Sequence, residues 1–149
     1  MVTINKDFLV NGPITSLMVG EIISASNEPN IGAHSIFLGQ IRGDVVNEQC
    51  VTGIEYTAYP EMVDAELQKI TNQVIAKYND VIKIHILHSI GLVKCGEISL
   101  LVFVGCGHRK QSFKAIEEIV ELIKERLPVW KKEFLEDNSH NWPDNKTDR

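Results

Sequence analysis

The hydrophobic positions in the first third of the chain switch between the spacing typical of strands and that of helices. Residues 2–10 predict a short strand, which ends at the Asn-Gly-Pro turn signal of residues 11–13. Apolar residues then keep helical spacing over 14–25. A dense apolar stretch predicts a strand over 33–42, and the polar residues 43–49 predict a mobile loop. The chain therefore begins as strand, helix, strand.

The middle of the chain carries clearer signals of the same kinds. Alternation over 51–58 predicts a half-buried strand, and a wide apolar stripe predicts a second helix over 59–79. Alternating residues over 82–87 predict a strand with one core face, followed by a turn at the glycines of 91–96. The unbroken apolar run 98–104 is typical of a central strand that is buried on both faces.

A third helix is expected from about Gln111 to Leu127. Its inward stripe is predicted to be Phe113, Ile116, Val120, Ile123 and Leu127. Pro128 prevents an uninterrupted helix, because it removes a donor and clashes with the preceding turn. The axis should bend or restart there and bring Lys131 back toward the side of Lys124.

The predicted element order is β-α-β-β-α-β-β-α. Its two direct strand-to-strand steps break the alternation that a doubly wound parallel sheet requires. We therefore expect a single α+β domain over residues 1–135, with helices packed on a mainly antiparallel sheet. Residues 136–149 are polar and are expected to be a loose tail, or one that only a partner orders.

Composition excludes several classes of protein. Hydrophobic residues make up 44% and charged residues 23% of the 149 residues, as in ordinary globular domains. No apolar run approaches the ~18 residues of a membrane helix, and the N-terminus lacks the pattern of a secretory signal. The net charge of −5 argues against a general nucleic-acid binder. The three cysteines form no metal or disulfide motif, so a reducing, cytoplasmic location is expected.

Charge is distributed unevenly along the chain. Residues 108–132 hold seven Lys or Arg against four Glu, so this segment carries +3 and the remainder −8. A local cationic patch on an acidic protein indicates a discrete anion site. The alternative is a solvated helix face on which Glu and Lys pair one turn apart. The sequence leaves both open.

Two places could bind an anion. His108 and Arg109 follow the buried strand and precede the third helix, where free backbone N–H groups and the helix dipole favour phosphate or carboxylate. Arg42 ends a strand beside Gly43 and could hold a phosphate through two parallel hydrogen bonds. Each of these residues could instead be an ordinary solvent-facing side chain.

Lys124 and Lys131 are candidates for proton chemistry. If the third helix is interrupted at Pro128, the two lysines approach each other near Arg42 or Arg109. Like charges at short distance lower the pKa of a lysine, and such a lysine can act as acid, base or nucleophile near neutral pH. Ordinary surface lysines are the alternative.

Other chemistry-bearing residues give weaker signals. His85 and His88 lie three apart on a predicted strand, so they point to opposite faces and cannot share a metal ion. Cys106 is expected to be a small buried hydrophobe and not a catalytic thiol. The glycines of 91–97 lack the Lys-Ser/Thr of a phosphate-binding loop. No metal and no cofactor are therefore predicted.

Several short motifs, in this order, resemble the MoaE family, the large catalytic subunits of molybdopterin synthase. They are Gly32-Ala33 with residues 37–42, residues 54–60, His88-Ser89-Ile90-Gly91 with Gly96-Glu97, His108-Arg109 with Phe113, and residues 122–133. The last motif, in which Lys124 is followed by Pro128 and by Lys131-Lys132-Glu133, is the most specific. The resemblance covers roughly residues 1–135. Ser89 departs from it, since the family usually has Arg there.

The resemblance implies an α/β-hammerhead-like fold and a defined reaction. The family converts cyclic pyranopterin monophosphate into molybdopterin by adding two dithiolene sulfurs. The sulfur arrives as a thiocarboxylate on the C-terminal Gly-Gly of a small ubiquitin-like partner. A homodimer of large subunits, with one small subunit at each end, forms a heterotetramer. The region after Glu133 can supply a basic residue to the neighbouring pocket, and none is assigned here.

The same resemblance implies roles for individual residues. Lys124 would be the leading catalytic residue, with Lys131 assisting it. Phosphate and pterin would be held by Arg42, His108 and Arg109, and the pocket walls completed by Gln40, Ile41, Lys132 and Glu133. Cys106 would be dispensable, because the partner supplies the sulfur. Two rival functions remain open on residues alone: a phosphate-ester or nucleotide-modifying enzyme, and a non-catalytic module that docks an acidic partner.

Overall fold

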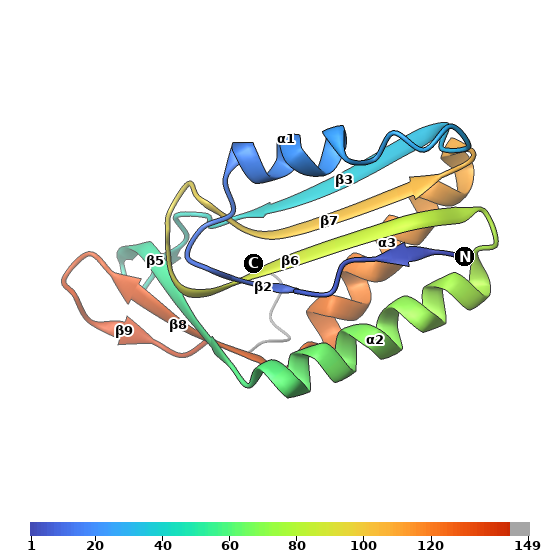
Figure 1. The fold of residues 1–149 in the computed structure, drawn as a ribbon. Helices are drawn as coiled ribbons and strands as arrows, with labels where there is room; N and C mark the ends of the chain where they lie inside the picture. Colours follow the sequence, from blue (N-terminus) through green and yellow to red (C-terminus); the bar gives the residue numbers. More distant parts are fainter. Residues whose placement is uncertain (144–149) are drawn as a thin grey trace.

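The computed structural model describes residues 1–143, which form three helices and nine strands (Figure 1). The helices are α1 (Ser16–Ser24), α2 (Pro60–Lys77) and α3 (Arg109–Arg126). The strands are β1 (Thr3–Ile4), β2 (Leu9–Asn11), β3 (Ala33–Gln40), β4 (Val45–Val46), β5 (Gln49–Ala58), β6 (Val81–Lys94), β7 (Ile98–Cys106), β8 (Val129–Leu135) and β9 (His140–Asn141). The predicted α+β class is confirmed.

The sheet is mainly antiparallel, as predicted. Its strands follow the order β3-β7-β6-β5-β8-β9, and every neighbouring pair in that path is antiparallel. Only β1 and β2 run parallel to their neighbour, β6, while β4 pairs with β5. The predicted element order was incomplete, because it lacked β4, β8 and β9 and treated β1 and β2 as one strand.

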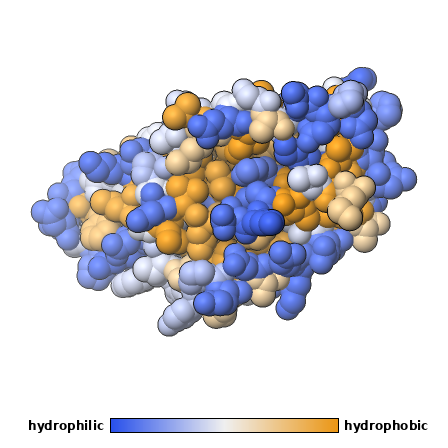
Figure 2. All heavy atoms as spheres, viewed as in Figure 1, coloured by the Kyte–Doolittle hydropathy of each residue, from blue (hydrophilic) through white to orange (hydrophobic). Residues whose placement is uncertain are grey.

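The helices cover the two faces of the sheet unequally. Helices α2 and α3 pack on one face over the larger hydrophobic core, and α1 packs on the other over a small cluster of Ile14, Ile22, Leu101 and Phe103 (Figure 1). Strand β7 lies between both layers, and eight of its nine residues are buried. The expectation of a strand buried on both faces is confirmed. In Figure 2, hydrophobic side chains gather over the sheet between α1 and the N-terminal strands.

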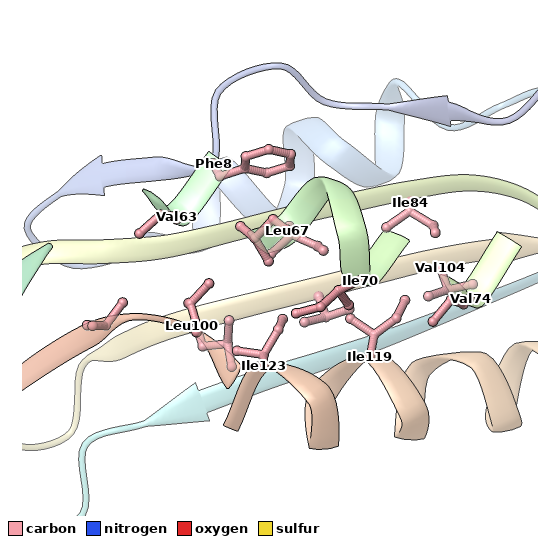
Figure 3. Packing of buried hydrophobic residues seen from close by; sticks show 14 of the residues in the cluster. Phe8, Val63, Leu67, Ile70, Val74, Ile84, Leu100, Val104, Ile119 and Ile123 are labelled. Atoms are coloured by element: carbon pink, nitrogen blue, oxygen red, sulfur yellow. The ribbon is translucent and has the colours of Figure 1, made fainter. Parts of the chain in front are cut away.

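The larger core is filled from α2, α3 and the facing strands, as Figure 3 shows. The predicted stripe of α2 is confirmed, since Val63, Leu67, Ile70 and Val74 are fully buried. Each such side chain stabilises the fold by about 1.5–3 kcal/mol when it leaves water. This face is therefore the rigid support on which the neighbouring polar residues are positioned.

The N-terminal segment is two strands because of Asn5. Its side-chain oxygen accepts a hydrogen bond from the backbone N–H of Ile86, and its amide donates to the Ile86 carbonyl, both near 2.9 Å. The side chain thus replaces the main chain for one step of the ladder with β6. The expected continuous strand over 2–10 is wrong for that reason.

Residues 43–49 were expected to be a mobile loop, and this is wrong in part. Strand β4 folds back on the start of β5 through a two-residue turn. The turn residues Asn47 and Glu48 both have positive φ, at 52° and 65°. This is the backbone twist that two-residue hairpins prefer, but Glu is a rare residue for it, so the sequence signal was weak.

The glycines of 91–96 do not bracket one turn. Strand β6 continues through Gly91 to Lys94, and the reversal lies at Cys95 and Gly96. Gly91 has φ +83°, which glycine adopts without strain. At this point β6 ends its pairing with β7 and β2 and begins to pair with β5. The glycine is a bend inside a long strand.

The predicted stripe of α3 is confirmed at Ile123 and Leu127, but before them it is rotated from the observed one. The buried residues are Ser112, Ala115, Ile119 and Ile123, whereas Phe113 is 61% exposed. Ile116 and Val120 are only partly buried at the edge of the core. Small residues pack where α3 lies close to the sheet, and a hydrophobicity pattern does not reveal that closeness.

The helix that was expected to bend or restart at Pro128 ends instead, and a strand follows it. Helix α3 stops at Arg126, and β8 begins at Val129 and pairs with β5. The loose tail is also wrong for residues 136–143. Glu136 and Asp137 bond to Cys50 and Gln49, and β9 pairs with β8. Residues 144–149 of the predicted tail lie outside the described residues.

Candidate active site

His88 lies on the core face of β6, two positions after Ile86, and only 7% of it is exposed. Its backbone N–H donates to the carbonyl of Phe8 at 2.7 Å. Its ring Nδ1 lies 2.7 Å from the carbonyl oxygen of Ser89. Because a carbonyl only accepts, Nδ1 carries the proton and Nε2 keeps its lone pair. The ring is thus fixed in one tautomer.

Lys124 and Lys131 act on this same ring. Burial lowers the pKa of His88 to about 4, the Ser89 carbonyl opposes the shift, and the positive charges of Lys131 and Lys124 add to it. His88 is therefore neutral at neutral pH. The two lysines come from α3 and β8, so the chain reversal after Leu127 places both ammonium groups within electrostatic reach of one buried imidazole.

Strand β8 lines the site with alternate residues. Lys131 lies directly across from Tyr56 of β5, and Glu133, which is buried, follows on the same face. The Tyr56 ring meets the His88 ring edge-on, with centroids 5.0 Å apart. The Tyr56 hydroxyl donates to Ser99 Oγ at 3.1 Å.

Tyr56 and Glu133 are both buried, and the charge of Glu133 acts on the Tyr56 phenol. The pKa of Tyr56 is raised chiefly by burial and also by the negative charge of Glu133, while the hydrogen bond with Ser99 lowers it. The Glu133 carboxylate accepts a hydrogen bond from the side-chain amide of Asn141 at 3.1 Å. The site therefore combines two ammonium groups, one carboxylate, a neutral imidazole and a neutral phenol.

Lys132 points to the other side of the sheet. It is paired across from Glu55, and its ammonium lies 5.3 Å from the ring of Phe134 and 5.8 Å from that of Trp142. Neighbouring residues of a strand face opposite sides. The structure thus separates Lys132 from Lys131, although the sequence motif joins them.

Gln40, Ile41 and Arg42 lie at the end of β3, at the same end of the sheet as His88. Gln40 is paired with Ile98 at the start of β7. Ile41 is buried and exchanges backbone hydrogen bonds with Gly96 and Glu97. The exposed Arg42 guanidinium forms an ion pair with Asp44 at 2.5 Å.

His108 and Arg109 lie at the opposite end of α3 from Lys124. Lys124 lies fifteen positions after Arg109 in the helix, which is about 22 Å along the axis at 1.5 Å per residue. His108 is the N-cap residue, and its ring is held by Asp80. The lysines were expected near Arg42 or Arg109, and the second alternative is wrong within one chain, because α3 holds Arg109 apart from Lys124.

Part of the basic segment is an ordinary paired helix surface. Arg126 donates to Glu66 at 2.6 Å and to Gln73 at 3.0 Å, both on α2. Lys77 of α2 pairs with Glu118 of α3 at 2.6 Å. These pairs join α2 to α3, whereas the solvated-face alternative expected pairs one turn apart on a single helix. Lys124 and Lys131 differ from them because their positive charges act on His88.

The remaining chemistry-bearing groups do not join this site. Cys106 is buried, and burial, with the nearby charge of Asp80, raises the pKa of its thiol to about 11. Ser89 is fully buried, and its hydroxyl has no partner among residues 1–143. Within those residues no three metal-ligating side chains come together, and no helix is long and apolar enough to cross a membrane. A shallow depression elsewhere, over α1, is lined by Ser16, Leu17, Gly20, Glu21, Ser24 and Ala25.

Sequence reasoning missed His88 and Tyr56 as members of the site. The signal was present for His88, because Ile84, Ile86 and His88 share one face of the strand. A polar residue that continues a core-facing series must be satisfied by neighbours, which marks it as a position of interest. The sequence around Tyr56 gives no such signal. Only the pairing of β5 with β8, which sets Tyr56 opposite Lys131, shows that it belongs to the site.

Together, these features define an α+β protein with a cationic site at the junction of α3, β8 and the central strand β6. The model of the family described as MoaE protein matches residues 14–126. The molybdopterin synthase catalytic subunit of Taeniopygia guttata is 35% identical over 141 residues, with 95% of this chain and 89% of the relative covered. That of Emericella nidulans is 35% identical over 120 residues, and the chain spans 60% of its length.

Solved structures agree with these relatives. Molybdopterin synthase from Staphylococcus aureus superposes with a TM-score of 0.82 at 30% identity, covering 93% of this chain and 96% of that one. A complex of subunits 1 and 2 of the molybdopterin-converting factor from Helicobacter pylori has the same fold, with a TM-score of 0.76 at 21% identity, covering 91% and 88%. The chain belongs to the MoaE family, the molybdopterin synthase catalytic subunits of molybdenum cofactor biosynthesis.

Proposed function

We propose that this chain transfers sulfur to cyclic pyranopterin monophosphate and so forms the dithiolene of molybdopterin. The sulfur donor is the thiocarboxylated C-terminus of a small ubiquitin-like partner. Both reactants are anions, and the observation that carries the proposal is that the positive charges of Lys124, exposed on α3, and Lys131, on β8, both act on one buried, neutral imidazole. Converging ammonium groups on an acidic protein favour the binding of two anions at one place.

Lys124 is the catalytic residue of this scheme, and Lys131 assists it. Lys124 moves protons and balances charge as the sulfur attacks and the acyl-thioester intermediates collapse. The backbone and side chains of Gln40, Ile41 and Arg42 line the substrate side, and Glu133 supports the wall from β8, whereas Lys132 faces the other side of the sheet. Release of Arg42 from Asp44 would free its guanidinium for the phosphate.

The partner is expected to thread its C-terminal Gly-Gly into this site. A Gly-Gly end suits such a site, because glycines lack side chains and approach the backbone closely. The Helicobacter pylori structure contains two subunits of a molybdopterin-converting factor, which is consistent with a stable pair. We place the reaction in the cytoplasm, where thiols stay reduced.

A second copy of the chain completes the substrate site in this proposal. His108 and Arg109 are about 22 Å along α3 from Lys124, so they reach a phosphate or pterin bound at the lysines only if they belong to a neighbouring copy. The hydrophobic band between α1 and the N-terminal strands is a surface suited to such a contact (Figure 2). The complete assembly is then a heterotetramer.

Reconstitution tests the proposal. Purified chain is mixed with precursor and thiocarboxylated small subunit, and dithiolene product is measured for the wild type and for Lys124→Ala. Loss of a positioned acid–base group typically costs 10²–10⁴ in rate, so we expect product to fall by about 100-fold or more. Lys114→Ala, also on α3, serves as the matched control and retains the wild-type rate.

Two results would contradict the proposal. Turnover that continues when the Gly-Gly tail of the small subunit is deleted would exclude that tail as the sulfur donor. Product formation by Lys124→Ala at the wild-type rate would exclude Lys124 as the catalytic residue. Hydrolysis of a phosphate ester or nucleotide by the chain alone, without the small subunit, would favour the rival enzyme class.

A further inference from the structure

The exposed ring of His108 is held in place by Asp80. Asp80 Oδ2 accepts from the backbone N–H of His108 at 2.7 Å and lies 3.2 Å from its ring Nδ1. The His108 side chain is 87% exposed, and an exposed side chain normally samples several rotamers. One carboxylate oxygen here contacts both the backbone and the ring of His108, and so orients the ring relative to the start of α3.

Asp80 is itself tightly positioned by its surroundings. Its backbone N–H donates to the side-chain oxygen of Gln111 at 2.9 Å, and its carbonyl accepts from the backbone N–H of Gly107 at 3.1 Å. The Gln111 amide also donates to Asn79, so one side chain of α3 bonds to both residues of the turn before β6. A side chain at Gly107 would place its Cβ 2.6 Å from Asp80 Oδ1, so only glycine permits this approach.

The contact decides which ring nitrogen of His108 carries the proton. A carboxylate accepts and does not donate, so Nδ1 carries the hydrogen when the ring is neutral. Nε2 then presents a lone pair to solvent at the first turn of α3. Beside it, Arg109 supplies donors only. The two neighbours therefore offer different chemistry: an acceptor at His108 and a cationic donor at Arg109.

We propose that Asp80 is a positioning residue for substrate binding, which orients His108 so that Nε2 accepts a hydrogen bond from a ring N–H of the pterin. Arg109 holds the phosphate of the same substrate. This rests on the proposed function, in which these residues face the site of a second copy. It goes further because it assigns the acceptor for the pterin ring to His108 and the donor for the phosphate to Arg109.

Asp80→Asn tests the inference. The asparagine oxygen still accepts from the His108 backbone, so the start of α3 is kept. A neutral amide oxygen accepts more weakly than a carboxylate, so the Nδ1–H form of the ring loses stabilisation. We expect the ¹⁵N spectrum of the His108 ring to move from the Nδ1–H form toward the Nε2–H form. The signal is assigned by its absence in His108→Ala, because the chain has five histidines.

Binding of cyclic pyranopterin monophosphate to the full chain is measured by calorimetry in parallel. A mispositioned hydrogen bond weakens binding by about three- to tenfold, which is the expected rise in Kd for Asp80→Asn. Asp64→Asn, the same change at an exposed position of α2, is the matched control and leaves Kd unchanged. In a His108→Ala background, Asp80→Asn should add nothing, because Asp80 acts through His108.

Two outcomes would overturn the inference: an unchanged ring tautomer with unchanged Kd, or an equal loss of affinity with and without His108. Neither measurement needs turnover, so the result is separable from the proposed function. If Asp80→Asn weakens binding through His108 but the reconstituted wild type forms no dithiolene, the proposed reaction fails and the positioning role stands. If product forms and Asp80→Asn leaves the tautomer and Kd unchanged, only the positioning role fails.

Discussion

At the scale of single residues, burial sets the charge of the groups around the two lysines. His88 and Tyr56 lie in the core with fixed hydrogen-bond partners, and burial favours the uncharged form of each. The neutral His88 and Tyr56 add no negative charge beside Lys124 and Lys131. The site can therefore attract anions although the whole chain carries −5.

His88 should make the protein sensitive to acid. Its folded pKa of about 4 lies below the usual 6.5, so the unfolded chain binds the proton first as the pH falls. The stabilisation is complete above pH 6.5 and is lost toward pH 4. Acidification from pH 7 to pH 5 should cost about 2 kcal/mol through this residue. Urea unfolding at both values should show a smaller loss for His88→Gln than for the wild type.

The control for this prediction is His140→Gln, which makes the same change at an exposed position. It should lose as much stability on acidification as the wild type does. If His88→Gln also loses the full wild-type amount between pH 7 and pH 5, His88 is not the buried neutral group described here.

Cys106→Ala should leave activity within about twofold of the wild type. The thiol is buried and its pKa is raised to about 11, so almost no thiolate forms at neutral pH. Removal of one small buried side chain should cost about 1 kcal/mol of unfolding free energy. The reconstituted product assay and urea unfolding measure the two effects. A marked loss of product would assign sulfur chemistry to this chain.

At the scale of elements, β6 is the strand that organises the site. It pairs with β7 and the N-terminal strands over most of its length and with β5 beyond Gly91. The bend at Gly91 turns its end toward β5, whose other edge carries β8 and Lys131. The positive φ of Gly91 thus lets the strand of His88 pair with β5, which in turn pairs with the strand of Lys131.

Gly91→Ala should destabilise the fold by about 1–3 kcal/mol, because a side chain is strained at φ +83° and its Cβ would lie 3.0 Å from Asn11 Oδ1. Gly20→Ala is the matched control within α1, where an added Cβ meets no atom within 4 Å. It should stabilise the protein by about 0.5–1 kcal/mol, since alanine favours helix. Urea unfolding compares them, and equal effects would contradict the strain at Gly91.

At the scale of the whole molecule, one straight helix separates two groups of site residues. Lys124 and His88 lie at one end of α3, whereas His108, Arg109 and Asp80 lie at the other. No rotamer change spans this distance in one chain. Symmetric dimers routinely bring opposite ends of an element together across a two-fold axis, which makes a shared site possible.

Mixed dimers test this sharing. Lys124→Ala and His108→Ala should each be nearly inactive alone. After subunit exchange, half of the dimers are mixed, and each mixed dimer holds one intact site. Activity should therefore recover to about one quarter of the wild type in the reconstituted product assay. No recovery, despite proven exchange, would mean that His108 and Lys124 serve the site from the same chain or that His108 is not used.

Several features could be predicted from sequence because they repeat along the chain. The α2 stripe and the doubly buried β7 can be recognised from the spacing of hydrophobic residues along a short stretch of sequence. Strand β8 was missed, since its inward face carries Lys131 and Glu133 and does not look like a core strand. The phase of α3 was also missed, because Ser112 and Ala115 are buried for their small size.

The sequence by itself determined the class of fold, the family and the basic motif, because these depend on local periodicity and on residue order. Tertiary structure decided which charged side chains share a space. It brought Lys131 to His88 by pairing β8 with β5, turned Lys132 to the other side, and kept His108 at the far end of α3. Electrostatic interactions depend on distance in space, and strand pairing and helix length set that distance.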